Sequence, residues 1–271
     1  MSRLADRFAA ARAEKRAALV IYLTADDPDV DTSRRLILAA AEAGADIIEI
    51  GVPWSDPSAD GKVIQAAMHR ALAKGGGLKR SLRLCRAVRD ANPNLGLVLF
   101  GYANPIVVMG PEAFAVKARE AGADGVLCVD YPPDEDRELT TALAAQGLDF
   151  VTLLAPTSTP ARIDAALAAA RGFVYYVSLT GITGTALADL EAPRIQVAAI
   201  KARTGGKLPV AVGFGIRTPG AARSVATFAD GVVVGSAAVE IVEKAAAAGR
   251  DPVPELSAFV RSLRDALAPV A

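Results

Sequence analysis

Short apolar runs recur along the chain at regular intervals, and segments rich in Ala, Leu, Arg and Glu lie between them. Within the runs, Val, Ile, Leu, Phe and Tyr follow one another without strict alternation of polar and apolar residues. This pattern is typical of strands that are buried on both faces of a parallel sheet. The runs lie near residues 17–24, 46–51, 96–102, 124–130, 148–155, 173–178, 208–215 and 230–237.

The segments between these runs carry apolar residues at helical spacing. Several begin after Pro or Asp and end at Gly, as helices commonly do. Helices are expected over residues 32–43, 63–73, 111–121, 134–146, 160–170 and 219–228, with further helices over 2–16 and 251–268. Eight strands that alternate with helices predict an α/β protein, a single (β/α)8 TIM barrel with an extra N-terminal helix and a C-terminal helix. No break in composition divides residues 1–271, so one domain is expected.

Charge and composition exclude several classes of partner. The chain has 271 residues, with 30 basic and 30 acidic side chains mixed along it, which argues against a nucleic-acid groove or a basic membrane face. No apolar run of about 18 residues indicates a membrane span. The charged N-terminus lacks the apolar core of a secretory signal, so a cytoplasmic protein is expected. Cys85 and Cys128 lack a CxxC spacing, and we expect both to be buried as small apolar residues.

The last two strand-like runs both end in glycine, at Gly213 and Gly215 in one and at Gly235 in the other. Glycine lets backbone N–H groups approach an anion, and a helix N-terminus, where Ser236 is expected as the N-cap, favours negative charge. Taken singly, each glycine is more typical of a turn without a ligand. Because barrels often bind phosphate through the loops after their seventh and eighth strands, the pair predicts a phosphate site, to which Gly184 would add an N–H group.

Two acidic residues are candidates for proton transfer. Glu49 interrupts an apolar run, and alternation places it with Ile47 and Gly51 on the face that points into the barrel. Apolar surroundings raise the pKa of a carboxyl group, which suits a residue that gives and takes a proton near neutral pH. Asp60 follows on the loop before the next expected helix, near the same end of the barrel.

Each acid also has a structural interpretation that the sequence leaves open. Glu49 would be structural if it paired with an Arg or Lys side chain. Asp60 would be structural if it capped the following helix, and Asp56 is most simply a turn residue.

The residues that are absent restrict the chemistry further. The only histidine, His69, lies in an expected helix, so neither a His-based catalytic triad nor a multi-His metal site can form, and no metal is expected. Lys207 precedes a strand and belongs to the opposite end of the barrel, which disfavours a Schiff-base aldolase. Apolar walls for a flat aromatic ligand would come from residues near strand ends, namely Tyr22, Phe100, Tyr102, Leu127, Tyr175 and Phe214.

Several segments together resemble the tryptophan synthase alpha-subunit family. They are IEIGVPWSDPSADGKVIQ (48–65), GYANPI (101–106), GVLCVDYPPDE (125–135), LLAPTSTPARI (153–163), YYVSLTGITG (175–184), VGFGI (212–216) and GVVVGSA (231–237). They follow the family's order over nearly the whole chain. The resemblance implies a barrel that cleaves indole-3-glycerol phosphate to indole and glyceraldehyde 3-phosphate, with no cofactor or metal of its own. It also implies a PLP-dependent beta subunit as partner, usually in an alpha2-beta2 heterotetramer that passes indole between subunits.

By position, the resemblance also implies roles for individual residues. Glu49 would be the acid/base, Asp60 would bind the indole N–H, and Tyr175 with Thr183 would help to position them. The phosphate would be held by Gly184, Gly213, Gly235 and Ser236. The indole pocket would be lined by Tyr22, Phe100, Leu127, Tyr175, Phe214 and Val233. The face toward the beta subunit would carry Pro53, Asp56, Asn104 and Asp130.

The chain departs from the family pattern at a few positions. The family usually has Phe where Trp54 stands and Pro where Lys62 stands, and it often has Phe at the position of Tyr22. Trp54 is the only tryptophan, and because Trp is a common interface anchor we expect it to become buried when the beta subunit binds.

Two other functions stay open on the sequence alone. Another phosphate-binding barrel, such as a sugar-phosphate isomerase or a stand-alone lyase that releases free indole, would use the same fold. A chain that mainly regulates a beta subunit would need only the interface, and the presence of both Glu49 and Asp60 argues against it.

Overall fold

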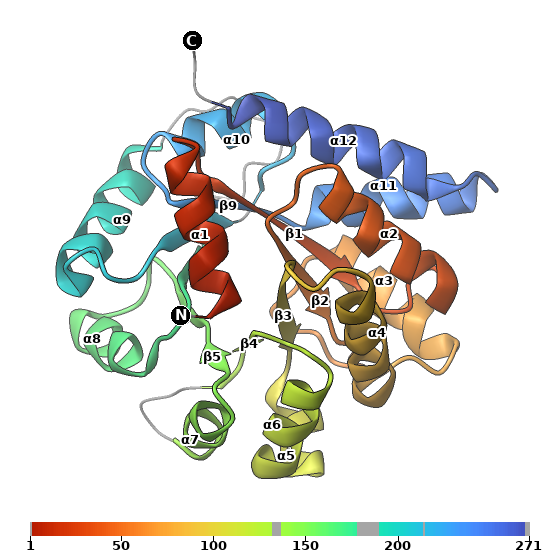
Figure 1. The fold of residues 1–271 in the computed structure, drawn as a ribbon, viewed down its shortest axis with the longest axis horizontal. Coiled ribbons are helices and arrows are strands. Elements are labelled where there is room, and N and C mark those ends of the chain that lie inside the picture. Colours follow the sequence, from red (N-terminus) through yellow and green to blue (C-terminus); the bar gives the residue numbers. More distant parts are fainter. Residues whose placement is uncertain (1, 132–136, 178–189, 214, 269–271) are drawn as a thin grey trace.

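In the residues that the computed structural model describes, 2–131, 137–177, 190–213 and 215–268, nine parallel strands form one sheet that curls into a nearly closed barrel ringed by helices (Figure 1). The strands are β1 (Ala18–Thr24), β2 (Ile47–Gly51), β3 (Gly96–Gly101), β4 (Gly125–Cys128), β5 (Asp149–Phe150), β6 (Thr152–Leu154), β7 (Val174–Val177), β8 (Val210–Gly213) and β9 (Gly231–Val234). The helices are α1 (Arg3–Ala13), α2 (Val30–Glu42), α3 (Lys62–Ala73), α4 (Leu78–Ala91), α5 (Ala103–Met109), α6 (Pro111–Glu120), α7 (Glu138–Ala145), α8 (Pro160–Ala169), α9 (Glu191–Thr204), α10 (Pro219–Ala226), α11 (Ser236–Ala247) and α12 (Pro252–Ala266).

The sheet closes on itself through one segment of the chain. The strand order is β5-β4-β3-β2-β1-β9-β8-β7-β6, so its two ends, β5 and β6, are separated in sequence only by Val151. The single strand expected over 148–155 is therefore wrong in detail, because the segment pairs first with β4 and then, after Val151, with β7. The Val151 amide still donates to the Val126 carbonyl at 2.9 Å. Together, β5 and β6 therefore take the place of one of the eight expected strands of the barrel.

Alternation along the strands separates an inner core from an outer one, as expected. Ile47 packs in the inner cluster with Val20 and Val98. Ile48 and Ile50 pack in the outer cluster, between the sheet and the helices. The inner face of β2 is therefore the face that carries Glu49.

The extra helix α1 covers the end of the barrel at which the strands begin (Figure 1). Leu4 and Phe8 are buried against the starts of the strands, where glycine leaves room for them. A Cβ on Gly96 would lie 3.2 Å from the Leu4 side chain, and one on Gly231 would lie 2.9 Å from the Phe8 ring. With this end filled, the functional groups of the inner face lie toward the other end, where the strands finish; we call that end the mouth.

Helix boundaries agree closely with the predicted ones, since local capping sets them. The Thr159 and Thr218 side chains accept the backbone N–H groups of Arg162 and Ala221, and proline follows each cap. Within the helix expected over 134–146, α7 begins only at Glu138, and residues 132–136 lie outside the described part.

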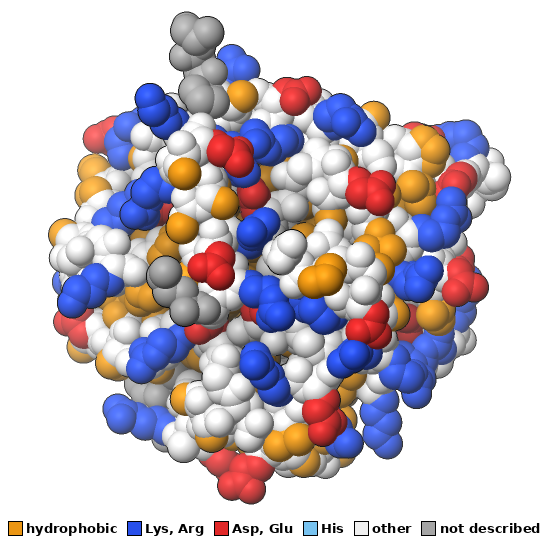
Figure 2. Space-filling view, in the orientation of Figure 1, with side chains coloured by type: hydrophobic (Ala, Val, Ile, Leu, Met, Phe, Trp, Pro, Cys, Tyr) orange, Lys and Arg blue, Asp and Glu red, His pale blue; other side chains and the backbone are white. Residues whose placement is uncertain are grey.

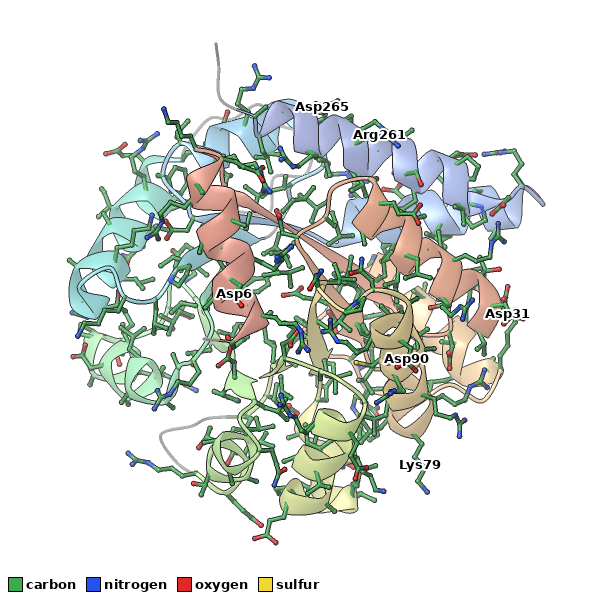
Figure 3. All side chains as sticks on the ribbon, viewed as in Figure 1. Asp6, Asp31, Lys79, Asp90, Arg261 and Asp265 are labelled. Carbon is green, nitrogen blue, oxygen red and sulfur yellow. The ribbon has the colours of Figure 1, made fainter. Side chains whose placement is uncertain are left out.

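The surface carries charges of both signs. Figure 2 shows Lys and Arg interspersed with Asp and Glu on the face that carries α1. Side chains such as Asp31 and Lys79 point outward from the helices (Figure 3). Among the described helices, none is both long and apolar enough to cross a membrane.

Candidate active site

Glu49 lies in the middle of β2, on the inner face near the mouth. It is 1% exposed and stands opposite Tyr22 of β1 and Val98 of β3. No basic side chain of the described residues forms an ion pair with it, and its Oε1 atom has no hydrogen-bond partner there, so the structural ion-pair interpretation is wrong. Burial raises the pKa of Glu49 from 4.5 to about 8. At neutral pH the carboxyl group therefore carries its proton while remaining close to the point at which it can lose it.

Asp60 is held by a phenol from a different strand end. Its Oδ2 accepts a hydrogen bond from the Tyr102 hydroxyl at 2.7 Å, and the same hydroxyl accepts from the Ala59 amide at 3.1 Å. Gln65 donates to the Asp60 carbonyl at 2.8 Å. The N-cap of α3 is Gly61, so the interpretation of Asp60 as a helix cap is wrong. Burial raises the pKa of the Asp60 carboxyl, and the hydrogen bond from Tyr102 opposes that shift.

Tyr102 is the hydrogen-bond partner of Asp60 that sequence reasoning missed. The sequence suggests only an apolar wall at this position, since the residue follows the apolar strand β3. The structure buries Tyr102 to 3% exposure and points its hydroxyl at the loop that carries Asp60. Its place directly after Gly101, at a strand end on the mouth, was the available signal.

The predicted apolar walls come together around these acids. Tyr22, Phe100, Leu127, Tyr175 and Val233 all belong to the inner cluster. The Tyr22 and Phe100 rings meet edge to face, with centroids 5.2 Å apart. Phe214 lies outside the described residues.

Two glycines make room for the tyrosines. A Cβ on Gly51 would collide with the Tyr22 hydroxyl, and a Cβ on Gly213 would collide with the Tyr175 hydroxyl. Both hydroxyls therefore extend toward the mouth over the end of a neighbouring strand, as the registers of β1 with β2 and of β7 with β8 require.

The predicted phosphate residues lie where β8 and β9 end. Gly213 is the buried last residue of β8, and Gly235 connects β9 to α11. The expectation that Ser236 caps the helix is wrong by one residue, because α11 begins directly after β9, with Gly235 as N-cap and Ser236 as its first residue. The first N–H groups of such a helix have no partner within the helix and favour an anion. Thr183 and Gly184 lie outside the described residues.

The predicted partner face has an exposed and a buried part. Asp56, Asn104 and Asp130 are exposed, whereas Pro53 is buried in the isolated chain. The Asp130 carboxylate accepts the Ala103 amide at 2.7 Å and so holds the start of α5. On that helix the exposed fractions of Val107 and Val108 are 63% and 82%, which leaves an apolar patch beside the charged residues.

Another cavity, of about 280 Å³, lies at the opposite end of the molecule, among α1, α10 and α12. Of its basic lining residues, Arg16 is paired in bidentate fashion with Asp46, and its acidic lining residue Asp230 is paired with Lys201. Because its carboxylate is held in this ion pair, the cavity lacks the unpaired buried carboxyl group that the mouth offers for proton transfer. Across the described ranges, no three His, Cys, Asp or Glu side chains are grouped to hold a metal ion.

A buried carboxyl that holds its proton at neutral pH, beside a second carboxyl fixed by a phenol, is an arrangement for acid–base chemistry. Its location at the carboxyl ends of the strands places the chain among the (β/α)8-barrel enzymes.

Comparison with known proteins shows to which family of (β/α)8-barrel enzymes the chain belongs. The family model described as "Tryptophan synthase alpha chain" matches residues 8–268. The chain is 50% identical to the tryptophan synthase alpha chain of Burkholderia thailandensis over 267 residues, which cover 98% of this chain and 97% of that one. It is 49% identical to that of Thioalkalivibrio sulfidiphilus, with 98% and 100% covered.

Solved structures agree. The fold superimposes on tryptophan synthase subunit alpha of Legionella pneumophila with a TM-score of 0.91 at 37% identity, covering 98% of both chains. It superimposes on a Mycobacterium tuberculosis tryptophan synthase structure with a TM-score of 0.89 at 38% identity, covering 99% of both. The chain therefore belongs to the tryptophan synthase alpha chain family, a lyase family that cleaves indole-3-glycerol phosphate in tryptophan biosynthesis. Membership in this family implies a beta-subunit partner.

Proposed function

We propose that Glu49 and Asp60 carry out the cleavage of indole-3-glycerol phosphate by this chain. The observation that supports this most strongly is the state of Glu49, a buried carboxyl with a pKa of about 8 whose Oε1 has no hydrogen-bond partner among the described residues. A group that titrates near the working pH is suited both to giving and to taking a proton.

The reaction follows from the protonation states. Protonated Glu49 donates its proton to indole C3, which leaves a positive charge on the ring nitrogen. The resulting carboxylate then takes the proton of the glycerol hydroxyl next to the ring. The O–H electrons form the aldehyde carbonyl, and the electrons of the broken carbon–carbon bond return to the ring, so indole and glyceraldehyde 3-phosphate leave and Glu49 regains its proton.

Asp60 contributes by electrostatics. Its carboxylate binds the indole N–H and stabilises the positive charge that develops on the nitrogen. The Tyr102 hydroxyl, 2.7 Å away, favours the charged form of Asp60 and holds it in place. Tyr175 and Thr183 would help to position the two acids.

The rest of the substrate would be held by the walls and the helix terminus already described. The indole ring would lie among Tyr22, Phe100, Leu127, Tyr175, Phe214 and Val233. The phosphate would bind backbone N–H groups at Gly184, Gly213, Gly235 and Ser236, with the N-terminus of α11 adding a favourable field.

We also infer how the chain works in the cell. It would act as one barrel domain in the cytoplasm and bind a PLP-dependent beta subunit in an alpha2-beta2 assembly. The contact face would include Asp56, Asn104 and Asp130, with Pro53 behind them. Trp54 on the same loop is only half-buried, so its fluorescence should change on complex formation. Unchanged emission on titration with a beta subunit would count against this face.

The experiment that tests the function measures indole release from indole-3-glycerol phosphate, with and without a beta subunit. Glu49→Gln and Asp60→Asn should each abolish most of the activity, whereas Glu112→Gln, on the exposed start of α6, should not. Full activity in either of the first two variants would remove that residue from the mechanism. Fast release by the isolated chain, with no further acceleration by the beta subunit, would instead indicate a stand-alone lyase.

A further inference from the structure

The hydroxyl of Tyr22 lies inside the proposed site, and the hydrogen bond that it forms among the described residues is a long one. Tyr22 is 2% exposed. The polar contact found for its hydroxyl is with Thr24, whose Oγ1 donates to it at 3.4 Å. A distance of 3.4 Å is long for a bond between two hydroxyl groups, so this buried O–H group can form a stronger hydrogen bond with a ligand in the site.

The surroundings fix this hydroxyl at one place in the mouth. The Tyr22 ring packs edge to face on Phe100, and its hydroxyl end lies over Gly51. In the register of β1 with β2, Tyr22 stands directly opposite Glu49. Burial, followed by the negative charge of Asp60 and then of Glu49, raises the pKa of Tyr22 well above its usual value. The phenol therefore keeps its proton and acts as a hydrogen-bond donor at working pH.

The polar groups of the substrate leave one kind of acceptor for this donor. The indole ring offers only an N–H donor, which the proposed function assigns to Asp60. The phosphate is assigned to the ends of β8 and β9. The remaining polar atoms are the two hydroxyl oxygens of the glycerol chain, and Glu49, opposite Tyr22, acts on one of them.

We propose that the Tyr22 hydroxyl donates a hydrogen bond to a hydroxyl oxygen of the glycerol chain and thereby makes the site selective for a hydroxylated chain. The role of the phenol is then distinct from that of its ring, which forms part of the apolar wall. This inference rests on the proposed function, because it takes indole-3-glycerol phosphate as the substrate.

The test compares the substrate with indole-3-propanol phosphate, which has the same ring and phosphate but no chain hydroxyls. In Tyr22→Phe, kcat/KM for indole-3-glycerol phosphate should fall about three- to tenfold, as expected for the loss of one neutral hydrogen bond. The inhibition constant of the deoxygenated analogue should stay within about twofold of the wild-type value, because no bond to it is lost. The matched control is Tyr176→Phe, since Tyr176 is equally buried but packs in the outer cluster; it should change neither constant.

The outcomes separate this inference from the function on which it rests. If Tyr22→Phe weakens both ligands equally, or weakens neither, the hydroxyl does not bind the glycerol chain and the inference is overturned. If the wild-type chain with its beta subunit fails to cleave the substrate, the proposed function fails and the inference falls with it. Should Tyr22→Phe fold poorly, Gly51→Ala serves instead, because it displaces the end of the ring together with the hydroxyl. It should weaken both ligands, but the substrate about three- to tenfold more than the analogue, and equal losses would refute the idea.

Discussion

Replacing Glu49 by Gln should make the stability of the fold less dependent on pH. Burial raises the pKa of Glu49 from 4.5 to about 8, so the folded state binds this proton more tightly than the unfolded state does. The stabilisation that protonated Glu49 provides is fully present below about pH 4.5 and is lost as the pH rises through about 8. At about 1.4 kcal/mol per pKa unit, the full change amounts to about 5 kcal/mol. Gln has a similar shape and does not titrate, so the variant avoids this loss.

The assay is urea unfolding at pH 5 to 9, followed by circular dichroism, for the wild type, Glu49→Gln and the exposed control Glu112→Gln. The free energy of unfolding of Glu49→Gln, relative to wild type, should rise by about 3.5 kcal/mol between pH 5 and pH 8. The free energy of unfolding of the control should change with pH in the same way as that of the wild type. If the free energy of unfolding of Glu49→Gln also follows the wild-type pH dependence, Glu49 is not protonated in the folded state at neutral pH. The proposed order, in which Glu49 first donates a proton and then takes one, then fails as well.

Three further predictions concern the active site and an ion pair that stabilises the fold. Tyr102→Phe removes a hydrogen bond to the Asp60 carboxylate and should lower kcat about 10- to 100-fold in steady-state assays with the fold intact; an unchanged kcat would mean that Asp60 needs no such support. Because protonated Glu49 starts the reaction, kcat/KM should fall as the pH rises through about 8, and a profile that is flat from pH 7 to 9 would contradict this order. Arg70→Met leaves the buried Asp27 without its bidentate partner and should lower the free energy of unfolding by about 2 kcal/mol in urea; no loss would show that the ion pair is energetically neutral.

Local pattern was sufficient to predict most of the fold. Runs of β-branched and aromatic residues alternate with helical segments, and proline, threonine and glycine mark their ends, so the barrel and its helix boundaries follow from short-range chemistry. The inward direction of Glu49 also follows locally, because alternation along a strand decides which face carries which side chain. The break at Val151 was not predictable, since it depends on which neighbouring strand each residue meets.

The sequence by itself determined which residues reach the mouth of the barrel, because strand period and strand ends are local properties. Only the tertiary structure decided their chemical state. Whether Glu49 is paired or protonated depends on whether a basic side chain from elsewhere reaches it, and among the described residues none does. Asp60 meets Tyr102 from 42 positions away, through the packing of a loop on another strand end. Burial and long-range partners set a pKa, and both come from the folded chain as a whole.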